Sequence, residues 1–572
     1  MAIDANLAER VRNWLAADPD PITRNGLDDL LHAAQAGDEE AAAEIADAFA
    51  ADLDFGTAGL RGALGPGPNR MNLAVVTRAA AGIVAWLRTG VGEDGAARGV
   101  VVCFDARHRS ADFAERSAAV FAAAGIRAYV LPGPLPTPVL AYAVGHFGAA
   151  AGVMVTASHN PPQDNGYKVY DASARQIVAP VDAAIVAGIE ATPRACDVPY
   201  AASDDPDIVR VGDELVQSYV EAASQVGLVP DARDVVAAYT AMHGVGAATV
   251  RRTFAAAGFA PVVEVVEQVE PDPDFPTVAF PNPEEPGALD LGLATARRAG
   301  AQVLLANDPD ADRLGAAVPD PSVVEGWRLL RGDEIGVILA HHLFEHGGVA
   351  DGDVVATTIV SSTLLSKVAA ARGVRFVETL TGFKWLGRAA EPDGHLAFGY
   401  EEALGYCAGG LVRDKDGITA ALLLAEAVAV LATEGRTVLD VLDDLAIAHG
   451  VHQTAQWSVR VAGGDAMEQL TAAMQRMRAA PPVELAGRPV IAIDDLVDGD
   501  QARRFAPSDV LIWHLEAGRI VVRPSGTEPK LKAYIEVVEP VTAHGDLATS
   551  RQRAQVALDE LVAATAAATG LG

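Results

Sequence analysis

Short apolar segments that alternate with helical stretches constrain the fold of this chain more than any other feature. Residues 99–104, 126–131 and 152–156 are largely apolar, and helix-like sequence separates them. Strands that are apolar on both faces are typical of α/β sheets that helices cover on both sides. The same pattern begins again near Val209 and near Trp327. The sequence therefore predicts three similar α/β domains.

Both ends of the chain differ from this pattern. Residues 7–51 are rich in Ala, Asp and Glu and have a helical pattern, so we interpret them as an N-terminal helical extension. After about residue 450 the strands lie in more polar surroundings and a helix follows from about Asp546, which indicates an α+β domain. We expect four domains, at residues 1–208, 209–325, 326–450 and 451–572.

The chain is strongly acidic, with a formal net charge of −32. This charge repels the phosphates of nucleic acids and anionic membrane surfaces, so we expect neither as a partner. An anionic substrate would need a locally positive site. The N-terminus has no basic segment followed by an apolar stretch, and the apolar run at residues 420–432 is too short to span a bilayer. We therefore expect a cytoplasmic location.

The first candidate site follows the strand at residues 152–156. Its sequence is Thr-Ala-Ser-His-Asn-Pro, and an Asn-Gly turn then leads to Lys168. These dipeptides favour tight turns, and ligands of open α/β sheets bind at the carboxyl ends of strands. The pattern predicts a loop that presents Ser158, His159 and Lys168. Serine becomes a nucleophile only beside a base, a cation or a metal, so the segment by itself is equally compatible with a structural turn.

The second candidate site is Asp-Pro-Asp-Ala-Asp-Arg at residues 308–313, directly after an apolar strand. Three carboxylates at alternate positions of an extended loop can converge as oxygen ligands of Mg²⁺. A bound cation would also relieve the repulsion between the three like charges. The Gly and the final Glu of an EF-hand loop are missing. The candidate metal ligands are Asp308, Asp310 and Asp312.

The third candidate site lies at residues 521–530, Val-Val-Arg-Pro-Ser-Gly-Thr-Glu-Pro-Lys. A guanidinium group, two hydroxyls and backbone N–H groups around a glycine can bind a phosphate. The pattern differs from a P-loop, because Gly-x₄-Gly-Lys-Ser/Thr is missing. The residues expected to contact the phosphate are Arg523, Ser525, Gly526, Thr527 and Lys530.

A fourth region combines carboxylates with an aromatic ring and an ammonium group. Glu401 and Glu402 lie beside small residues at the end of an apolar segment, and carboxylates can accept hydrogen bonds from vicinal sugar hydroxyls. Upstream, Thr-Gly-Phe-Lys-Trp presents Lys384 and Trp385 beside a glycine. Each segment alone is also typical of a charged surface turn.

Taken together and in this order, these segments resemble the α-D-phosphohexomutase superfamily over essentially the whole chain. Phe-Gly-Thr-Ala-Gly-Leu-Arg-Gly at residues 55–62 and Gly-Pro-Asn-Arg-Met-Asn at residues 67–72 resemble its longer branch, which includes bacterial phosphoglucomutases and phosphomannomutases and animal phosphopentomutases. The resemblance implies an α/β protein in which three similar α/β domains with mixed sheets and a C-terminal α+β domain surround a central cleft.

The resemblance also implies roles for the candidate residues. Ser158 would carry the phosphoryl group, Mg²⁺ would bind to the three aspartates and the seryl phosphate, and Arg61 and Lys168 would lie at the reacting centre. The segment from Arg523 to Lys530 would hold the non-reacting phosphate. The sugar would contact Lys384, Trp385 and Glu401. Lys168 and His159 are both candidates for the general acid/base, and the sequence does not choose between them.

The implied activity interconverts hexose 1-phosphate and hexose 6-phosphate, of glucose or mannose, through a phosphoserine enzyme and a sugar bisphosphate intermediate that also acts as activator. Ala403 stands where many glucose-specific members have serine, which leaves the preferred sugar open. The alternatives are a phosphopentomutase acting on ribose or deoxyribose 1-phosphate and a metal-dependent sugar phosphatase. We expect a monomer or a homodimer.

Overall fold

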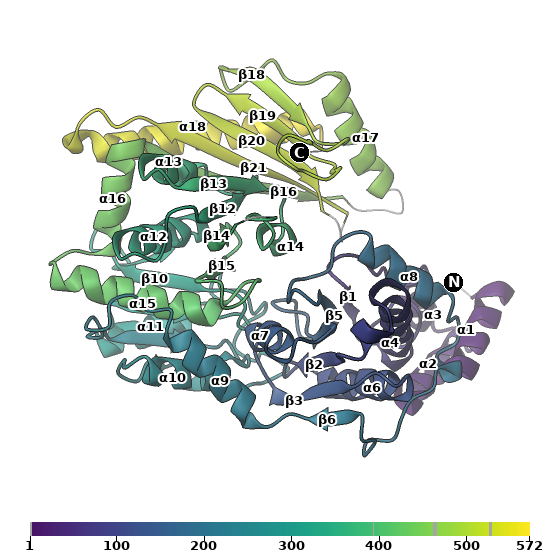
Figure 1. The fold of residues 1–572 in the computed structure, drawn as a ribbon. Coiled ribbons are helices and arrows are strands. Elements are labelled where there is room, and N and C mark those ends of the chain that lie inside the picture. The colour runs from purple at the N-terminus through teal and green to yellow at the C-terminus, as the bar shows by residue number, and fades with distance from the viewer. Residues whose placement is uncertain (1–2, 393, 462–465, 526–528, 572) are drawn as a thin grey trace. The chain divides into compact units, whose positions relative to one another are not determined.

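The computed structural model describes residues 3–571 except 393, 462–465 and 526–528 (Figure 1). The chain divides into two compact units. Unit 1 contains Met1–Leu330 and Gly405–Ala429, and unit 2 contains Arg331–Leu404 and Val430–Gly572.

Unit 1 begins with three helices, as the N-terminal pattern predicts: α1 (Ala5–Ala17), α2 (Pro21–Gln35) and α3 (Glu39–Ala48). An aspartate caps each N-terminus, because its carboxylate accepts a hydrogen bond from a backbone N–H of the first turn. The helices bury their apolar faces in a small core of their own that includes Val11, Leu27 and Ile45.

The first sheet has the strand order β1-β5-β4-β2-β3-β6. Strands β4, β2, β3 and β6 are parallel, whereas β1 and β5 run antiparallel to their neighbours. The strands are β1 (Leu60–Ala63), β2 (Val100–Phe104), β3 (Ala128–Pro134), β4 (Ala151–Val155), β5 (Asp164–Asp171) and β6 (Ile208–Arg210). The helices are α4 (Leu73–Trp86), η1 (Leu87–Val91), α5 (Glu93–Ala96), α6 (Ser110–Ala123), α7 (Thr137–Phe147), α8 (Val181–Glu190) and η2 (Ala195–Asp197).

Both faces of this sheet are covered, which explains its continuously apolar strands. Val100 and Val102 of β2 belong to one core together with residues of α4, α6 and α8. On the opposite face, Gly152 of β4 lies so close to α7 that a Cβ atom there would be 2.5 Å from Val144 Cγ2. No strand position in the middle of the sheet therefore faces water.

The second sheet has the order β11-β10-β9-β7-β8, with β8, β7 and β9 parallel and β10 and β11 antiparallel. Its strands are β7 (Ala237–Thr240), β8 (Val263–Glu264), β9 (Val303–Ala306), β10 (Gly315–Pro319) and β11 (Trp327–Leu330). The associated helices are α9 (Asp213–Ser224), α10 (Gly246–Ala256), η3 (Val266–Gln268) and α11 (Asp290–Ala299). The segment Gly405–Ala429 of unit 1 contains β15 (Gly405–Ala408) and most of α15 (Gly417–Thr433).

Unit 2 contains a third parallel arrangement, in which β12 pairs with β13 and β14, and a C-terminal antiparallel sheet of order β16-β21-β20-β19-β18-β17. The first group contains α12 (Gly332–Glu345), β12 (Val354–Thr358), α13 (Leu364–Ala371), β13 (Arg375–Thr379), α14 (Phe383–Leu386), β14 (Leu396–Glu401) and α16 (Val438–His449). The second contains β16 (Val451–Arg460), α17 (Ala466–Ala479), β17 (Glu484–Leu485), β18 (Arg488–Asp495), β19 (Leu511–Leu515), β20 (Gly518–Pro524), β21 (Lys530–Glu539), η4 (His544–Asp546) and α18 (Leu547–Thr569). The predicted fold class, three α/β domains followed by an α+β domain, is confirmed.

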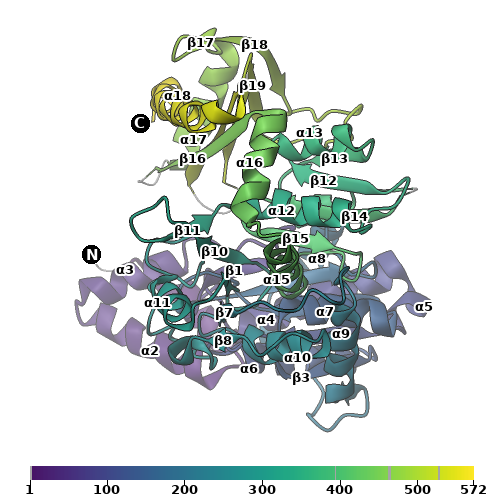
Figure 2. The same cartoon turned by 90° about the vertical axis from the view of Figure 1, so that its left-hand side faces the viewer.

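The C-terminal sheet is also covered on both faces. Helices α17 and α18 pack on one face, around Trp513 (Figure 2). The other face places Ile512 and Val521 in a core with Ile359 and Leu380 from the β12–β13 region. A buried polar network adds to this interface, because Arg519 of β20 donates hydrogen bonds to Glu378 Oε1 (2.6 Å) and to the carbonyl of Ser361 (2.9 Å).

Among the described residues, one helical stretch, Leu73–Val91, is long and apolar enough to cross a membrane by length and composition. Of its most apolar window, 61% is buried inside the protein. Helices α15 and α16 pass the same test only when they are counted together, and they are bent by 87° at their junction.

Candidate active site

The predicted serine loop begins where β4 ends. Ser158 is buried and has a left-handed backbone, with φ of 54°, which is uncommon for a residue other than glycine. Its N–H donates to Thr156 Oγ1 (2.9 Å). Its hydroxyl donates to Asp308 Oδ2 (2.8 Å) and lies 3.1 Å from His159 Nδ1. The serine hydroxyl therefore lies against the carboxylate of a loop 150 residues further along the chain.

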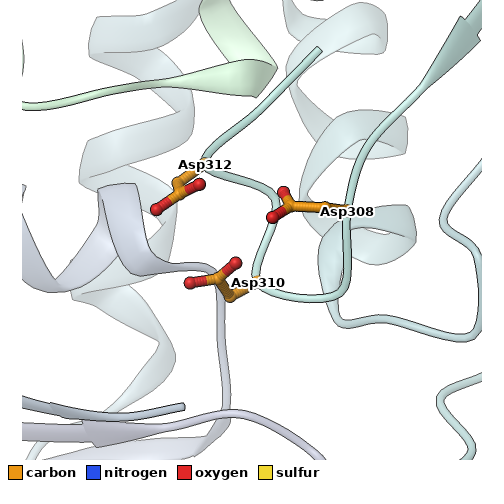
Figure 3. Close-up of side chains that lie close together, drawn as sticks. All are labelled: Asp308, Asp310 and Asp312. Atoms are coloured by element: carbon orange, nitrogen blue, oxygen red, sulfur yellow. The ribbon is translucent and has the colours of Figure 1, made fainter. Parts of the chain in front are cut away.

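That second loop follows β9 and brings the three aspartates together. Asp308, Asp310 and Asp312 are fully or almost fully buried, and each offers an oxygen within 4.8 Å of the others. Figure 3 shows the three carboxylates pointing toward one another. Among the described residues this is the only group of three or more acidic, His or Cys side chains with that geometry.

Two carboxylate oxygens in this group are suited to a cation. Asp310 Oδ1 and Asp312 Oδ1 are buried and have no hydrogen-bond partner among the described residues. Buried oxygens without a donor are costly, and a divalent cation such as Mg²⁺ prefers ligands of this type. The residues present therefore fit a metal ion.

Two backbone N–H groups shape the aspartate loop through the hydrogen bonds that they donate. The N–H of Arg313 donates to Asp308 Oδ1 (3.0 Å), which closes the loop on itself. The N–H of Val245 donates to the carbonyl of Pro309 (2.8 Å). Gly244 permits this contact, because a Cβ atom there would lie 2.3 Å from Pro309 Cα.

Two ammonium groups balance the charge of the aspartates. Lys168 Nζ on β5 donates to Asp310 Oδ2 (2.7 Å) and to Asp312 Oδ2 (3.0 Å). Lys415 Nζ lies 3.3 Å from Asp312 Oδ2. A hydroxyl also contributes, because Thr137 Oγ1 donates to Asp310 Oδ2 (2.7 Å).

The aspartates differ in their acidity. Burial and the carboxylates of Asp310 and Asp312 raise the pKa of Asp308 well above its ordinary value. Burial also acts to raise the pKa of Asp310, but the ammonium of Lys168 outweighs it, so this pKa is lowered. For Asp312, burial and Asp310 are outweighed in the same way by Lys168 and Lys415, and its pKa is lowered. Two carboxylates of the triad are thus held ionised by neighbouring lysines.

The predicted residues Lys168, Arg61 and His159 lie around the same point. Burial acts to lower the pKa of Lys168, but the two aspartates outweigh it, so the pKa is raised and the side chain is an ammonium ion. Arg61 on β1 donates to Asn160 Oδ1 (3.2 Å), because β1 pairs with β5 beside the serine loop. Burial, Arg313 and Arg61 lower the pKa of His159 well below its ordinary value, so its imidazole is neutral.

The sequence prediction assigns no role to three further residues at this site: Thr137, Lys415 and Arg107. Lys415 belongs to a charged turn whose proximity to Asp312 depends on a contact across 103 positions of the chain. Arg107 lies just after β2 and donates to carbonyls of the serine loop. Its position after a buried strand is the one signal that the sequence offers, since strand ends carry the other functional loops as well.

The residues expected to contact the sugar and its distal phosphate lie in unit 2. Lys384 and Trp385 belong to α14, with Lys384 Nζ 6.0 Å from the centre of the Trp385 ring. Glu401 is the last residue of β14. Arg523 lies on β20, and the N–H of Ser525 donates to the carbonyl of Lys530 (2.7 Å) at the start of β21. Gly526 and Thr527 lie outside the described residues.

Within unit 2, Tyr534 connects the two predicted groups. Burial and the Glu402 carboxylate raise the pKa of Tyr534, and the guanidinium of Arg523 opposes them, so the phenol lies beside both groups. Burial and Glu401 raise the pKa of Glu402 to about 8, and Glu402 Oε2 accepts a hydrogen bond from Ser361 Oγ (3.0 Å). The Glu402 carboxylate and the Arg523 guanidinium therefore both lie near Tyr534.

Comparison with known families identifies the chain. Models of the phosphoglucomutase/phosphomannomutase family match in chain order: alpha/beta/alpha domain I at residues 52–195, domain II at 217–321, domain III at 331–447 and the C-terminal domain at 457–547. The chain belongs to the phosphoglucomutase/phosphomannomutase family. It is therefore a phosphomutase, an isomerase that transfers a phosphoryl group within a sugar phosphate, and the resemblance inferred from the motifs is confirmed.

Curated relatives of this phosphomutase carry different substrate names. A "Probable phosphomannomutase" of Haemophilus influenzae is 42% identical over 473 residues, covering 82% of this chain and 93% of that protein. A "Probable phosphoribomutase" of Schizosaccharomyces pombe is 36% identical, covering 93% and 94% of the two chains. The phosphopentomutase of Mus musculus is 34% identical, covering 94% and 92%. Hexose and pentose names thus both occur among similar proteins.

A solved structure has the same fold. The exocytosis-sensitive phosphoprotein pp63/parafusin, a phosphoglucomutase from Paramecium, matches in its open form with a TM-score of 0.65 and 20% identity. The match covers 91% of this chain and 96% of that chain.

Proposed function

We propose that this phosphomutase interconverts the 1-phosphate and 6-phosphate of a hexose, glucose or mannose or both, through phosphoserine 158 and a sugar bisphosphate. The observation that carries the proposal is the 2.8 Å contact between Ser158 Oγ and the buried aspartate triad. A phosphoryl group on that oxygen would lie between the triad and the ammonium of Lys168. The 42% identity to a protein named for mannose supports a hexose substrate.

In the first half of the proposed reaction, the bond between phosphorus and Ser158 Oγ breaks while a free sugar hydroxyl forms a new bond to phosphorus. The hydroxyl gives up its proton, and Ser158 Oγ gains one. The product is a bisphosphate, which reverses its orientation so that its other phosphoryl group returns to Ser158. Added bisphosphate would act as an activator, because it phosphorylates any Ser158 that has lost its phosphoryl group.

The charged groups of unit 1 support this step. Phosphoryl transfer depends on positioning and on neutralising the charge of the phosphoryl oxygens. Mg²⁺ held by Asp308, Asp310, Asp312 and the phosphoserine would supply part of that neutralisation. Lys168 and Arg61 supply fixed positive charge at the same point.

Geometry also supports a division of roles between the two candidates for general acid/base. The ammonium of Lys168 donates to two carboxylates and has no lone pair with which to accept a proton. His159 Nδ1 lies 3.1 Å from Ser158 Oγ, where a neutral imidazole can exchange a proton with that oxygen. We therefore assign proton transfer at Ser158 to His159 and charge stabilisation to Lys168.

We assign the remaining substrate-binding roles to residues of unit 2. Arg523, Ser525 and Lys530, with Gly526 and Thr527, would hold the phosphate that does not react. Glu401 would accept hydrogen bonds from sugar hydroxyls, and Lys384 and Trp385 would contact the sugar from α14. One phosphate site could serve both orientations of the bisphosphate.

A phosphopentomutase acting on ribose or deoxyribose 1-phosphate is the second candidate. The similarity to the mouse phosphopentomutase over nearly the whole chain favours it. Ala403 provides no hydroxyl beside Glu402 and leaves the preferred sugar open. A site that lacks a polar partner discriminates less strongly between sugars.

The test is a coupled assay with glucose 1-phosphate, mannose 1-phosphate and ribose 1-phosphate, each with MgCl₂ and a trace of the matching bisphosphate. We expect turnover of at least one hexose 1-phosphate, complete loss in Ser158→Ala, and no loss in Ser203→Ala, which alters an exposed serine. Intact-mass measurement should show one phosphoryl group on the parent and none on Ser158→Ala. Turnover of ribose 1-phosphate alone would favour the pentose candidate, and release of inorganic phosphate without isomer formation would indicate a phosphatase.

A further inference from the structure

Arg107 contacts the serine loop more extensively than any other side chain that the sequence left unassigned. Its side chain is 1% exposed. Nη2 donates to the carbonyls of Ser158 (2.6 Å) and Asn160 (2.5 Å), and Nη1 donates to the carbonyls of Pro161 (2.9 Å) and Asp164 (3.2 Å). One guanidinium group therefore binds four backbone carbonyls within seven residues of chain.

The guanidinium itself is held from two other sides. Asp105 Oδ2 lies 3.3 Å from Arg107 Nε, and Asp105 Oδ1 accepts hydrogen bonds from the Arg107 N–H (3.0 Å) and from Ser110 Oγ (2.7 Å). The Phe275 ring centre lies 5.0 Å from Arg107 Cζ, which is a cation–π distance. The carboxylate and the ring therefore add two contacts that hold the buried guanidinium in place.

The backbone conformation of Ser158 explains why these contacts of Arg107 matter. A left-handed conformation at a non-glycine residue is strained and persists only where its surroundings enforce it. The direction of the Ser158 side chain depends on this φ value, because rotation into the ordinary extended region would carry Oγ away from Asp308. Arg107 binds the carbonyl of the strained residue itself and those of three residues that follow.

We propose that Arg107 is a positioning residue for the phosphoryl-carrying serine: it holds the loop of residues 158–164 in the conformation that aims Ser158 Oγ at the aspartate triad. The inference rests on the proposed function, since it takes Ser158 as the phosphoryl carrier. Lysine would not replace Arg107, because a planar guanidinium with two NH₂ groups reaches several carbonyls at once and an ammonium does not.

The experiment compares Arg107→Lys, Arg107→Ala and the matched control Arg109→Lys. Arg109 is two residues away, also has positive φ, and forms ion pairs with Asp20 and Asp112 outside the serine loop. For both Arg107 variants we expect kcat to fall about 100-fold, the cost of a misplacement of roughly 1 Å. We expect KM to stay within about threefold of the parent value, since the groups proposed to bind substrate lie elsewhere. Arg109→Lys should keep both constants.

Chemical rescue separates positioning from a general loss of structure. Methylguanidinium added to Arg107→Ala should restore part of kcat, and it should restore none in Ser158→Ala. If Arg107→Ala does not fold, Arg107→Lys alone carries the comparison of kcat and KM. The proposal is overturned if the folded Arg107 variants keep kcat within about threefold of the parent, or if KM rises while kcat is unchanged.

A second measurement does not depend on activity. Hydrogen exchange of the backbone N–H groups at residues 157–160, 163 and 164 should be faster in Arg107→Lys than in the parent, with no change in Arg109→Lys. A parent protein that turns over no sugar phosphate would refute the proposed function, and the exchange measurement would still test whether Arg107 holds the loop. Equal exchange in all three proteins would overturn the positioning role.

Discussion

Replacing Lys168 with Met removes the main positive charge from the aspartate triad while retaining a side chain of similar length. The Lys168 side chain is 6% exposed, and its ammonium lies 2.7 Å and 3.0 Å from two buried carboxylate oxygens. Removing one partner of a buried ion pair costs about 3–5 kcal/mol, because the other charge stays buried. Lys415 Nζ lies 3.3 Å from Asp312 Oδ2 and 3.7 Å from Asp414 Oδ1, so it offsets charge at Asp312 and does not replace the contact of Lys168 with Asp310.

The assay is urea unfolding of the parent and Lys168→Met, in EDTA and in excess MgCl₂. With a slope near 3 kcal/mol per molar urea, a loss of about 3–5 kcal/mol lowers the midpoint by roughly 1–1.7 M. Mg²⁺ should stabilise the variant more than the parent, because Lys168 already neutralises part of the charge in the parent. Lys367→Met, which changes an exposed lysine on α13, is the control.

Two results would refute this reasoning. Equal midpoints of parent and Lys168→Met in EDTA would mean that the ammonium does not balance the aspartates in the folded protein. Equal stabilisation of both proteins by Mg²⁺ would mean that the cation does not bind at these carboxylates.

Two further predictions concern other parts of the molecule. Burial acts to raise the pKa of Glu536, but its hydrogen bond to His452 and the nearby Arg519 outweigh burial and lower this pKa to about 2. The ionised carboxylate therefore stabilises the folded protein. This stabilisation is complete above the unfolded pKa of about 4.5 and is lost as pH falls toward 2. At pH 7 the free energy of unfolding of Glu536→Gln should therefore be about 3 kcal/mol lower than that of the parent, as measured by denaturant unfolding. This difference in stability should shrink between pH 4.5 and pH 3. A difference that does not depend on pH would contradict the assignment. Gly244→Ala should destabilise unit 1 by about 1–3 kcal/mol and lower turnover, because the new Cβ would lie 2.3 Å from Pro309 Cα and displace the aspartate loop. Gly26→Ala is the control, because a Cβ atom at this position of α2 meets no other atom within 4 Å, and it should not destabilise the protein. Thermal unfolding and a coupled activity assay would compare the two variants. Equal stability and equal turnover of both variants would contradict the prediction.

The sequence alone predicted the elements and loops whose determinants are local. Strands that are apolar on both faces require helices on both sides of the sheet, so the alternation of apolar segments with helical stretches predicts the α/β domains. Ser158 and the three aspartates were found because each group lies in a short segment after a buried strand. The order of the motifs was enough to indicate the family. The four domain boundaries and the roles of the site residues stay predictions.

Only the tertiary structure decided which distant groups complete the site. Lys415 reaches Asp312 across 103 positions, Arg107 reaches the serine loop across 51, and Phe275 covers Arg107 from the second domain. The tertiary structure likewise placed Arg519 and Glu536 in the interface that joins the two sheets of unit 2. Such contacts leave no periodic or local signal, because they depend on how strands order within a sheet and how sheets pack. The sequence therefore identified the candidate groups for the chemistry, and the packing of the chain determined which groups hold and neutralise them.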